Sequence, residues 1–271
     1  MCGIVAYIGE KEAFPIVLKG LKRLEYRGYD SSGIAINNNL NLSLFKKQGK
    51  VAELEKHAEG VDTSGNIGIG HTRWATHGEP NDVNAHPHQS GNGKFALVHN
   101  GIIENYAILK KELISRGHKF KSETDTEVLM HLIEDIIEKE NVDLFEGVRQ
   151  ALHEVHGAYA IVVISKENNR ELIAARKSSP LVVGIGKGEF YIASDATPIV
   201  EYTKNVVYLE DGEIARLSLD SGLKIKTIGN VEKTPYIQEL ELQLEALEKG
   251  GYEHFMLKEI FEQPRSIMDC M

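Results

Sequence analysis

The stretch MCGIVAYIG, residues 1–9, places a cysteine directly after Met1 and continues as a short apolar strand over 2–8. If Met1 is removed, Cys2 carries both a thiol nucleophile and a free α-amine. A free thiol titrates near about 8.5 and an α-amine near about 7.7–8.0, so proton transfer from sulfur to nitrogen costs only about 1 kcal/mol. The stretch therefore fits an N-terminal nucleophile, and it fits equally well a small apolar residue buried in an N-terminal strand.

Composition and charge indicate a globular protein and exclude several classes of function. The chain has 271 residues, 42% of them hydrophobic and 26% charged, which is enough to bury a sizeable core. Its formal net charge of −9 argues against a nucleic-acid partner. The two cysteines, Cys2 and Cys270, stand at opposite ends of the chain, which favours a reducing, cytoplasmic location. No signal peptide or membrane span is expected, because the longest later apolar run, 158–164, is far shorter than roughly 20 residues.

Hydrophobic periodicity predicts strands and helices in mixed order. Strands are expected at 2–8, 33–36, 40–45, 67–74, 95–99, 158–165, 181–185 and 190–194, with a hairpin about Asp211-Gly212. Helices are expected at 14–24, 51–58, 103–116, 126–139 and 144–155. Runs of strands interrupted by a block of helices predict an α+β fold, in which antiparallel sheets carry helices on their outer faces.

The end of the chain differs from the rest in its pattern. Residues 238–249 have the composition of a charged connector, and a new helix is expected to begin at Pro264. We therefore predict one domain over residues 2–240, followed by a linker and the truncated start of a second domain over 241–271.

Three motifs carry candidate chemistry. Asn100-Gly101 supplies an amide NH₂ and a backbone N–H that fit an oxyanion hole, although Asn-Gly is also the commonest hairpin turn. The loop HTRWATHGEPN, residues 71–81, gathers Arg73, Trp74, Thr76 and His77, and an arginine there can grip a carboxylate with two parallel bonds. In SETDTEV, residues 122–128, Thr124 fits a helix N-cap, and Asp125 fits either a cap or an acceptor for a substrate ammonium.

Metal and nucleotide sites are not expected. The histidines at 71, 77, 86, 88 and 99 lack the spacing of Cys-x-x-Cys or His-Glu-x-x-His sites, so structural roles are favoured and neither a metal nor a cofactor is predicted. The stretch GIGKGEF, residues 184–190, leads into a strand and is expected to form a turn.

In combination, MCGIV, LEYRGYDSSGIAI (24–36), HTRWATHGEPN, VHNGIIENY (98–106) and SETDTEV resemble the class II glutamine amidotransferases, whose glutaminase domains are N-terminal-nucleophile hydrolases. The second and third motifs are similar to the aminotransferase branch that transfers nitrogen from L-glutamine to fructose 6-phosphate in hexosamine biosynthesis. The resemblance covers about residues 2–240, and HFMLKEIFEQP (254–264) is similar to the start of that branch's sugar-phosphate isomerase domain.

This resemblance implies a fold and a reaction. The fold is a four-layer α-β-β-α sandwich of two antiparallel sheets. In the reaction, Cys2 attacks the side-chain amide of L-glutamine, releases ammonia and leaves a thioester that water hydrolyses to glutamate. Asn100 and Gly101 would form the oxyanion hole.

The resemblance also assigns binding roles and partners. Arg73 would bind the α-carboxylate of glutamine and Asp125 its α-ammonium, while Thr76 and His77 line the pocket and Trp74 gates the ammonia path. Fructose 6-phosphate would bind only through the isomerase domain, the full-length enzyme would be a homodimer, and residues 1–271 alone would act as a glutaminase.

Two alternatives stay open from the sequence. The same domain serves other acceptors in related enzymes, such as the phosphoribosyl-diphosphate and asparagine-forming members. A protein of another class, a binding or regulatory module, would keep Met1 and use Cys2 only for packing.

Overall fold

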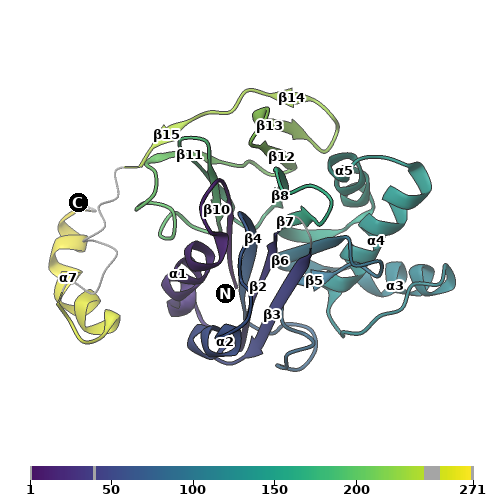
Figure 1. Cartoon of the computed structure of the whole chain (residues 1–271). Helices are drawn as coiled ribbons and strands as arrows, with labels where there is room; N and C mark the ends of the chain where they lie inside the picture. Colours follow the sequence, from purple (N-terminus) through teal and green to yellow (C-terminus); the bar gives the residue numbers. More distant parts are fainter. Residues whose placement is uncertain (1, 39–40, 241–250, 270–271) are drawn as a thin grey trace.

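The computed structural model describes residues 2–38, 41–240 and 251–269, and within them it contains two antiparallel sheets (Figure 1). The strands are β1 (Gly3–Ile8), β2 (Ser31–Asn37), β3 (Leu42–Gln48), β4 (Ile67–Arg73), β5 (His88–Gln89), β6 (Phe95–Ile103), β7 (Gly157–Ser165), β8 (Glu171–Lys177), β9 (Val182–Ile185), β10 (Phe190–Ala193), β11 (Asn205–Tyr208), β12 (Glu213–Ser218), β13 (Gly222–Thr227), β14 (Glu232–Lys233) and β15 (Gln238–Glu239). The helices are α1 (Ala13–Leu24), α2 (Val51–Ala58), α3 (Tyr106–Ser115), α4 (Asp125–Glu140), α5 (Leu144–Glu154), α7 (Phe255–Asp269) and the 3-10 turn η1 (Glu25–Arg27).

The first strand occupies the middle of the larger sheet. That sheet has the order β15-β11-β9-β10-β1-β4-β2-β3, and the smaller sheet has the order β14-β13-β12-β8-β7-β6-β5. The partners of β1 are β4, where Gly3 lies opposite Thr72, and β10. The N-terminal end of the chain is thereby fixed beside the end of β4.

Three hydrophobic layers hold the sheets and helices together. Successive residues of β1 point to opposite faces, so Ile4, Ala6 and Ile8 pack between the two sheets while Val5 and Tyr7 lie in the layer that joins the larger sheet to α1 and α2. The third layer joins the smaller sheet to α3, α4 and α5. Figure 1 shows the resulting order of helices, sheet, sheet and helices from left to right. The predicted α+β class and the four-layer α-β-β-α sandwich are both confirmed.

Most predicted elements are present, but two local predictions within the sandwich were wrong. The hairpin at Asp211-Gly212 does not form, because β11 pairs in the larger sheet and β12 in the smaller one, so the chain crosses between sheets there. The strand expected to end at residue 99 continues to Ile103, which places Asn100-Gly101 inside β6 and not in a turn. The turn expected in 184–190 does form, and it joins β9 to β10.

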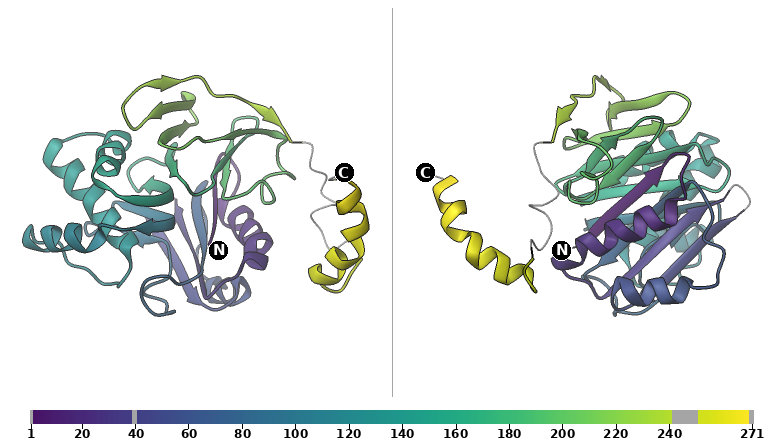
Figure 2. Two further views of the ribbon diagram at one scale, coloured as in Figure 1. Left: turned by 180° about the vertical axis from the view of Figure 1, so that it is seen from behind. Right: turned by 60° about the vertical axis from the view of Figure 1, so that its left-hand side comes forward.

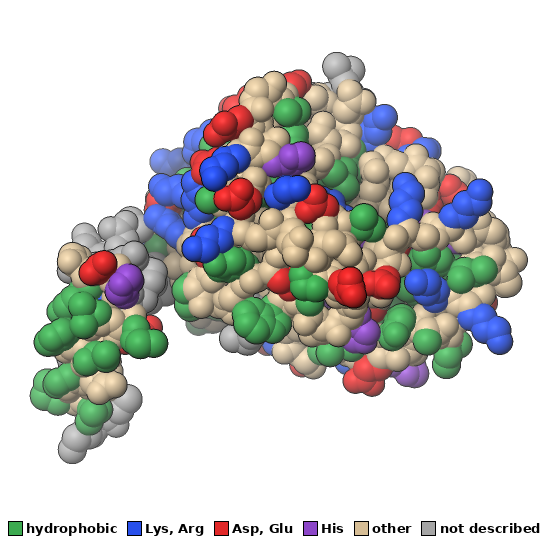
Figure 3. Space-filling view, turned by 90° about the horizontal axis from the view of Figure 1, so that it is seen from below, with side chains coloured by type: hydrophobic (Ala, Val, Ile, Leu, Met, Phe, Trp, Pro, Cys, Tyr) green, Lys and Arg blue, Asp and Glu red, His purple; other side chains and the backbone are tan. Residues whose placement is uncertain are grey.

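The end of the chain is also different from the prediction. A helix was expected to begin at Pro264, but α7 begins at Phe255 and contains Pro264 in its interior. Figures 1 and 2 show α7 apart from the sandwich, and Figure 3 shows hydrophobic side chains over much of its surface. Residues 241–249 of the predicted connector lie outside the described residues. The domain boundary at 240/241 stays a prediction. No helix among the described residues has the length and hydrophobicity that a membrane span needs.

Candidate active site

The thiol of Cys2 lies just before β1 and faces the backbone of the loop that follows β4. The Trp74 N–H donates to Sγ of Cys2 at 3.2 Å, and Sγ lies 3.6 Å from the Trp74 carbonyl oxygen. Burial raises the pKa of the Cys2 thiol, and the hydrogen bond from the Trp74 backbone and the charge of Arg73 offset part of that rise. The resting thiol is therefore protonated at neutral pH, and its activation needs a base. Met1 lies outside the described residues.

Arg73 shapes the loop that carries the other pocket residues. Its side chain is 4% exposed, and its Nη2 donates to the carbonyl oxygens of His77 and Gly78, the latter at 3.0 Å. Its guanidinium also lies 3.6 Å from Oδ1 of Asp30. A buried cation with carbonyl and carboxylate partners is stable. Arg73 thus fixes the loop and lines the pocket at once.

The motif at residues 24–36 supports the same loop from the other side. The Asp30 N–H donates to the Arg73 carbonyl oxygen at 2.7 Å, and its carboxylate accepts from the Ala75 N–H. Gly28, at φ 104°, lies under the ring of Trp74, where a Cβ would meet ring atom Cε3 at 2.4 Å. Trp74 itself is 55% exposed, so its ring covers Gly28 at the surface.

Strand β6 brings Asn100 and Gly101 from the smaller sheet to Cys2. The Asn100 side chain donates from Nδ2 to the Cys2 carbonyl oxygen at 3.4 Å, and its Oδ1 lies 2.9 Å from Nε2 of His71. Because an amide oxygen only accepts, His71 must carry its proton on Nε2. Gly101 has φ 134°, and a Cβ there would lie 2.0 Å from the Ala158 carbonyl oxygen, so only glycine fits.

The first turn of α4 contributes a carboxylate. Thr124 is the N-cap of α4, and its side chain accepts from the Glu127 N–H, as the sequence predicted. Asp125 follows it and is 4% exposed, with Oδ2 accepting from the Ile103 N–H at 2.8 Å. The buried carboxylate has one oxygen fixed by β6 and lies at the positive end of the helix dipole.

These segments enclose one small pocket that opens to solvent. It is lined by Cys2, Arg73, Trp74, Thr76, His77, His86, His99, Gly101, Thr124, Asp125 and Thr126. Seven of the eight predicted site residues therefore share a pocket, and the eighth, Asn100, contacts Cys2 directly. A thiol, a cation and an anion around one cavity form an arrangement that can hold a zwitterionic amino acid beside a nucleophile.

Two of the lining residues, His86 and His99, belong to a group of four buried histidines, which we call the neutral histidine group: His71, His86, His88 and His99. The rings of His71 and His86 have centroids 4.2 Å apart. Burial lowers the pKa of His71 to about 3, and it also lowers the pKa values of the other three. These rings are uncharged at neutral pH and act as hydrogen-bonding and packing groups.

Comparisons with known proteins agree with this geometry. The family described as "Glutamine amidotransferase domain" matches residues 71–201. The chain is similar to the glutamine--fructose-6-phosphate aminotransferase [isomerizing] of Bacteroides thetaiotaomicron, with 62% identity over 100% of this chain and 44% of the relative. The chain therefore contains a glutamine amidotransferase domain.

Other comparisons place this amidotransferase among its relatives. The Chlorobaculum tepidum protein of the same name is 55% identical over 100% of this chain and 44% of its own length. The structure of glutamine phosphoribosylpyrophosphate amidotransferase from B. subtilis superposes with a TM-score of 0.73 at 30% identity, covering 84% of this chain and 49% of that one. The amidotransferase thus spans less than half the length of the curated relatives it matches here.

Sequence reasoning alone missed several residues that build the amidotransferase site. Asp30 and Gly28 support the loop after β4, and His71 orients Asn100. Oγ1 of Thr126 forms a hydrogen bond of 2.9 Å with Nδ1 of His99. The signal for the first two was the motif YRGYD, which reads as an ordinary turn until its partner loop is known. His71 gave no signal, because its role depends on a contact between the two sheets.

Proposed function

We propose that the chain hydrolyses the side-chain amide of L-glutamine to glutamate and ammonia, with Cys2 as the nucleophile after Met1 is removed. The observation that carries this proposal is the position of the Cys2 thiol in a pocket that also presents Arg73 and Asp125. Free glutamine has an α-carboxylate and an α-ammonium to match these two charges, whereas glutamine within a peptide has neither.

The reaction proceeds in two steps. The Cys2 amine takes the thiol proton, and Sγ attacks the amide carbon to form a tetrahedral oxyanion, which the Asn100 Nδ2–H₂ and the Gly101 N–H stabilise. The C–N bond then breaks, the amine returns the proton to nitrogen, and ammonia leaves a γ-glutamyl thioester. Water hydrolyses the thioester to glutamate and frees the thiol.

The remaining predicted residues act on binding and on the path of ammonia. Thr76 and His77 line the side of the pocket, and Trp74, which also lines it, covers the route by which ammonia leaves. Ammonia must avoid protonation by bulk water to reach a second substrate.

In the longer protein we propose that this ammonia converts fructose 6-phosphate to glucosamine 6-phosphate. The names of the relatives at 62% and 55% identity support this acceptor over phosphoribosyl diphosphate, which appears in the name of a solved structure at 30% identity. Fructose 6-phosphate would bind outside this domain. A cytoplasmic location and a homodimeric full-length enzyme stay predictions.

Glutamate release by the purified chain tests the proposal, after intact mass has established that Met1 is absent. Cys2→Ala should abolish turnover, and Cys270→Ala, which removes the other thiol, should leave it unchanged. Turnover by Cys2→Ala would refute the cysteine mechanism. Transfer of nitrogen to fructose 6-phosphate by the full-length enzyme, but not to phosphoribosyl diphosphate, tests the acceptor.

A further inference from the structure

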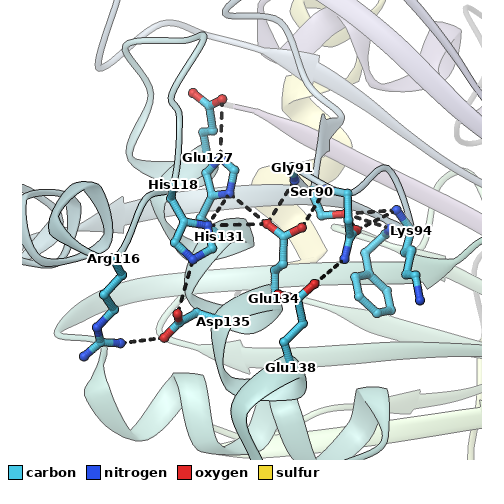
Figure 4. Close-up of polar contacts among 12 residues, drawn as sticks. Ser90, Gly91, Lys94, Arg116, His118, Glu127, His131, Glu134, Asp135 and Glu138 are labelled. Atoms are coloured by element: carbon cyan, nitrogen blue, oxygen red, sulfur yellow. Dashed lines mark hydrogen bonds and ion pairs between the residues drawn. The ribbon is translucent and has the colours of Figure 1, made fainter. Parts of the chain in front are cut away.

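A second cluster of histidines lies along α4, outside the pocket that contains Cys2, and is surrounded by carboxylates (Figure 4). We call it the histidine–carboxylate group: His118, His131, Glu127, Glu134 and Asp135. Its three central members are His118, in the loop between α3 and α4, and His131 and Glu134, which are three residues apart on α4. That spacing puts two side chains on one face of a helix.

Three electron-pair donors converge at the centre of this group. Nδ1 of His118 lies 3.2 Å from Nδ1 of His131, and Oε2 of Glu134 lies 2.9 Å from the latter and 3.6 Å from the former. The ligands of a tetrahedral zinc ion are about 3.3 Å apart at metal–ligand distances of about 2.0–2.2 Å. The observed triangle has these dimensions, so an ion can sit just above its plane within bonding distance of all three atoms.

The outer nitrogens of both rings face carboxylates. Nε2 of His118 lies 3.2 Å from Oδ1 of Asp135, and Nε2 of His131 lies 3.8 Å from Oε1 of Glu127. A carboxylate on the outer nitrogen holds the proton there and turns the lone pair of Nδ1 inward, which is how metal-binding histidines are commonly oriented. With both protons outward, two nitrogen lone pairs and a carboxylate oxygen point at one another, and they need a cation between them.

The supporting contacts fix the ligands in place. Glu134 accepts from the backbone N–H groups of Gly91 and Asn92 at 2.9 and 2.7 Å, and Asp135 pairs with Arg116 at 2.5 Å. The side chains of His131 and Glu134 are 2% and 4% exposed, while that of His118 is 14% exposed. The centre is therefore shielded, and the His118 side leaves a path to solvent for the ion.

We propose that His118, His131 and Glu134 bind a divalent transition-metal ion, with Zn²⁺ the best match. Two imidazole nitrogens and one carboxylate favour zinc over the hard cations Mg²⁺ and Ca²⁺, which prefer oxygen ligands. The three protein ligands leave a fourth position for water. The ion would join the loop at residue 118 to the second and third turns of α4, and that loop leads to Thr124 and Asp125 in the pocket. The role of the ion would therefore be structural. Without an ion, a second proton on His131 would supply the positive charge at the centre of the group.

Direct titration of the 271-residue chain with Zn²⁺, in competition with a chromophoric chelator, tests the site. Because the thiols of Cys2 and Cys270 would also bind zinc, the titration uses the double variant Cys2→Ser/Cys270→Ser. Bound metal is first removed from this variant with a chelator. One ion per chain is expected. His118→Ala and Glu134→Gln should each weaken binding at least about 100-fold, and Asp135→Asn, which only orients His118, about 10–100-fold. His57→Ala, on the exposed face of α2, is the matched control and should bind as the parent does.

Cobalt gives a second readout that does not depend on affinity. Co²⁺ in a four-coordinate site with nitrogen ligands should give strong visible absorption bands, which His118→Ala removes. Thermal unfolding of each stripped variant shows that it is folded, and His118→Gln replaces the alanine variant if that one is not. Absence of stoichiometric binding, or binding that survives both His118→Ala and Glu134→Gln, would overturn the proposal.

Discussion

The neutral histidine group and the histidine–carboxylate group both contact the N-terminal half of α4 and have opposite electrostatics. Oγ1 of Thr124, the N-cap of α4, lies 3.0 Å from Nε2 of His88 in the first group, and Glu127, three residues later, belongs to the second. In the first group burial acts almost unopposed and the pKa of His71 falls to about 3. In the second, burial also lowers the pKa of His131, but hydrogen bonds to Glu127 and Glu134 outweigh it and raise that pKa to about 9.

The difference shows that neighbours, more than burial, decide what a histidine does. An uncharged ring such as His71 can donate one fixed hydrogen bond to Asn100 without adding positive charge beside Cys2. A ring between carboxylates holds a cation instead. If the neutral histidine group serves the reaction and the histidine–carboxylate group only stabilises the fold, variants of the first should change turnover and variants of the second should change stability.

The largest effect on turnover is expected at Asn100, the residue that His71 orients. Asn100→Ala removes a donor to the oxyanion and should lower kcat about 10²–10³-fold with little change in KM, as measured by glutamate release. Asn168→Ala, in an exposed loop, is the control for the loss of an asparagine. A fall of less than about threefold would remove Asn100 from the mechanism.

Asp125 should have the next largest effect, through substrate binding. Asp125→Asn removes a charge-assisted hydrogen bond to the substrate ammonium, worth about 1.5–3 kcal/mol, and should lower kcat/KM for glutamine about 10–150-fold. Wild type should discriminate against 4-carbamoylbutanoate, which lacks the α-amine, and the variant should largely lose that discrimination. Equal discrimination by both proteins would contradict the assigned role.

The low pKa of His71 predicts a smaller effect on stability. Between about pH 6.5 and pH 3 the unfolded chain binds a proton at His71 that the folded chain does not, so stability falls as pH falls through this range. At pH 5.5 this contribution is about 1 kcal/mol. Urea unfolding at pH 7.5 and 5.5 should show that His71→Gln loses about 1 kcal/mol less than wild type, because other groups cancel in the difference. Equal losses would show that His71 is protonated in the folded state.

Metal removal is expected to have the smallest effect on catalysis. Because the histidine–carboxylate group does not line the pocket, chelation should lower the unfolding temperature but change glutamate release at 25 °C by less than about twofold. Re-addition of Zn²⁺ to the stripped protein, at a concentration too low to occupy Cys2, should restore the unfolding temperature. Loss of turnover on chelation, with recovery on zinc addition, would contradict the separation of the two groups.

The sequence predicted the strands and helices with strong periodicity, including α2 and α4, and the motifs led to the pocket residues. It failed where tertiary contacts override local pattern. Asp211-Gly212 has the composition of a hairpin, but its flanking strands find better partners in different sheets. Asn100-Gly101 reads as a turn, yet β7 pairs with β6 beyond it, with Gly101 opposite Tyr159.

The histidine–carboxylate group shows another limit of sequence reasoning. His131 and Glu134 are close on one helix, but His118 comes from a different segment, and no spacing rule joins it to them. The spacing of the histidines at 71, 77, 86, 88 and 99 predicted no metal site, and no motif drew attention to His118 or His131. The candidate site became visible only from the contacts that bring His118 to His131 and Glu134.

The most direct test of the central claim is the reaction of the purified chain with an electrophilic glutamine analogue, followed by intact and peptide mass spectrometry. The chain must first be shown to lack Met1. The account predicts one adduct per chain, located on Cys2, formed more slowly in the presence of L-glutamine and absent from Cys2→Ser. An adduct on Cys270 alone, or an unmodified Cys2 in fully processed protein, would contradict it.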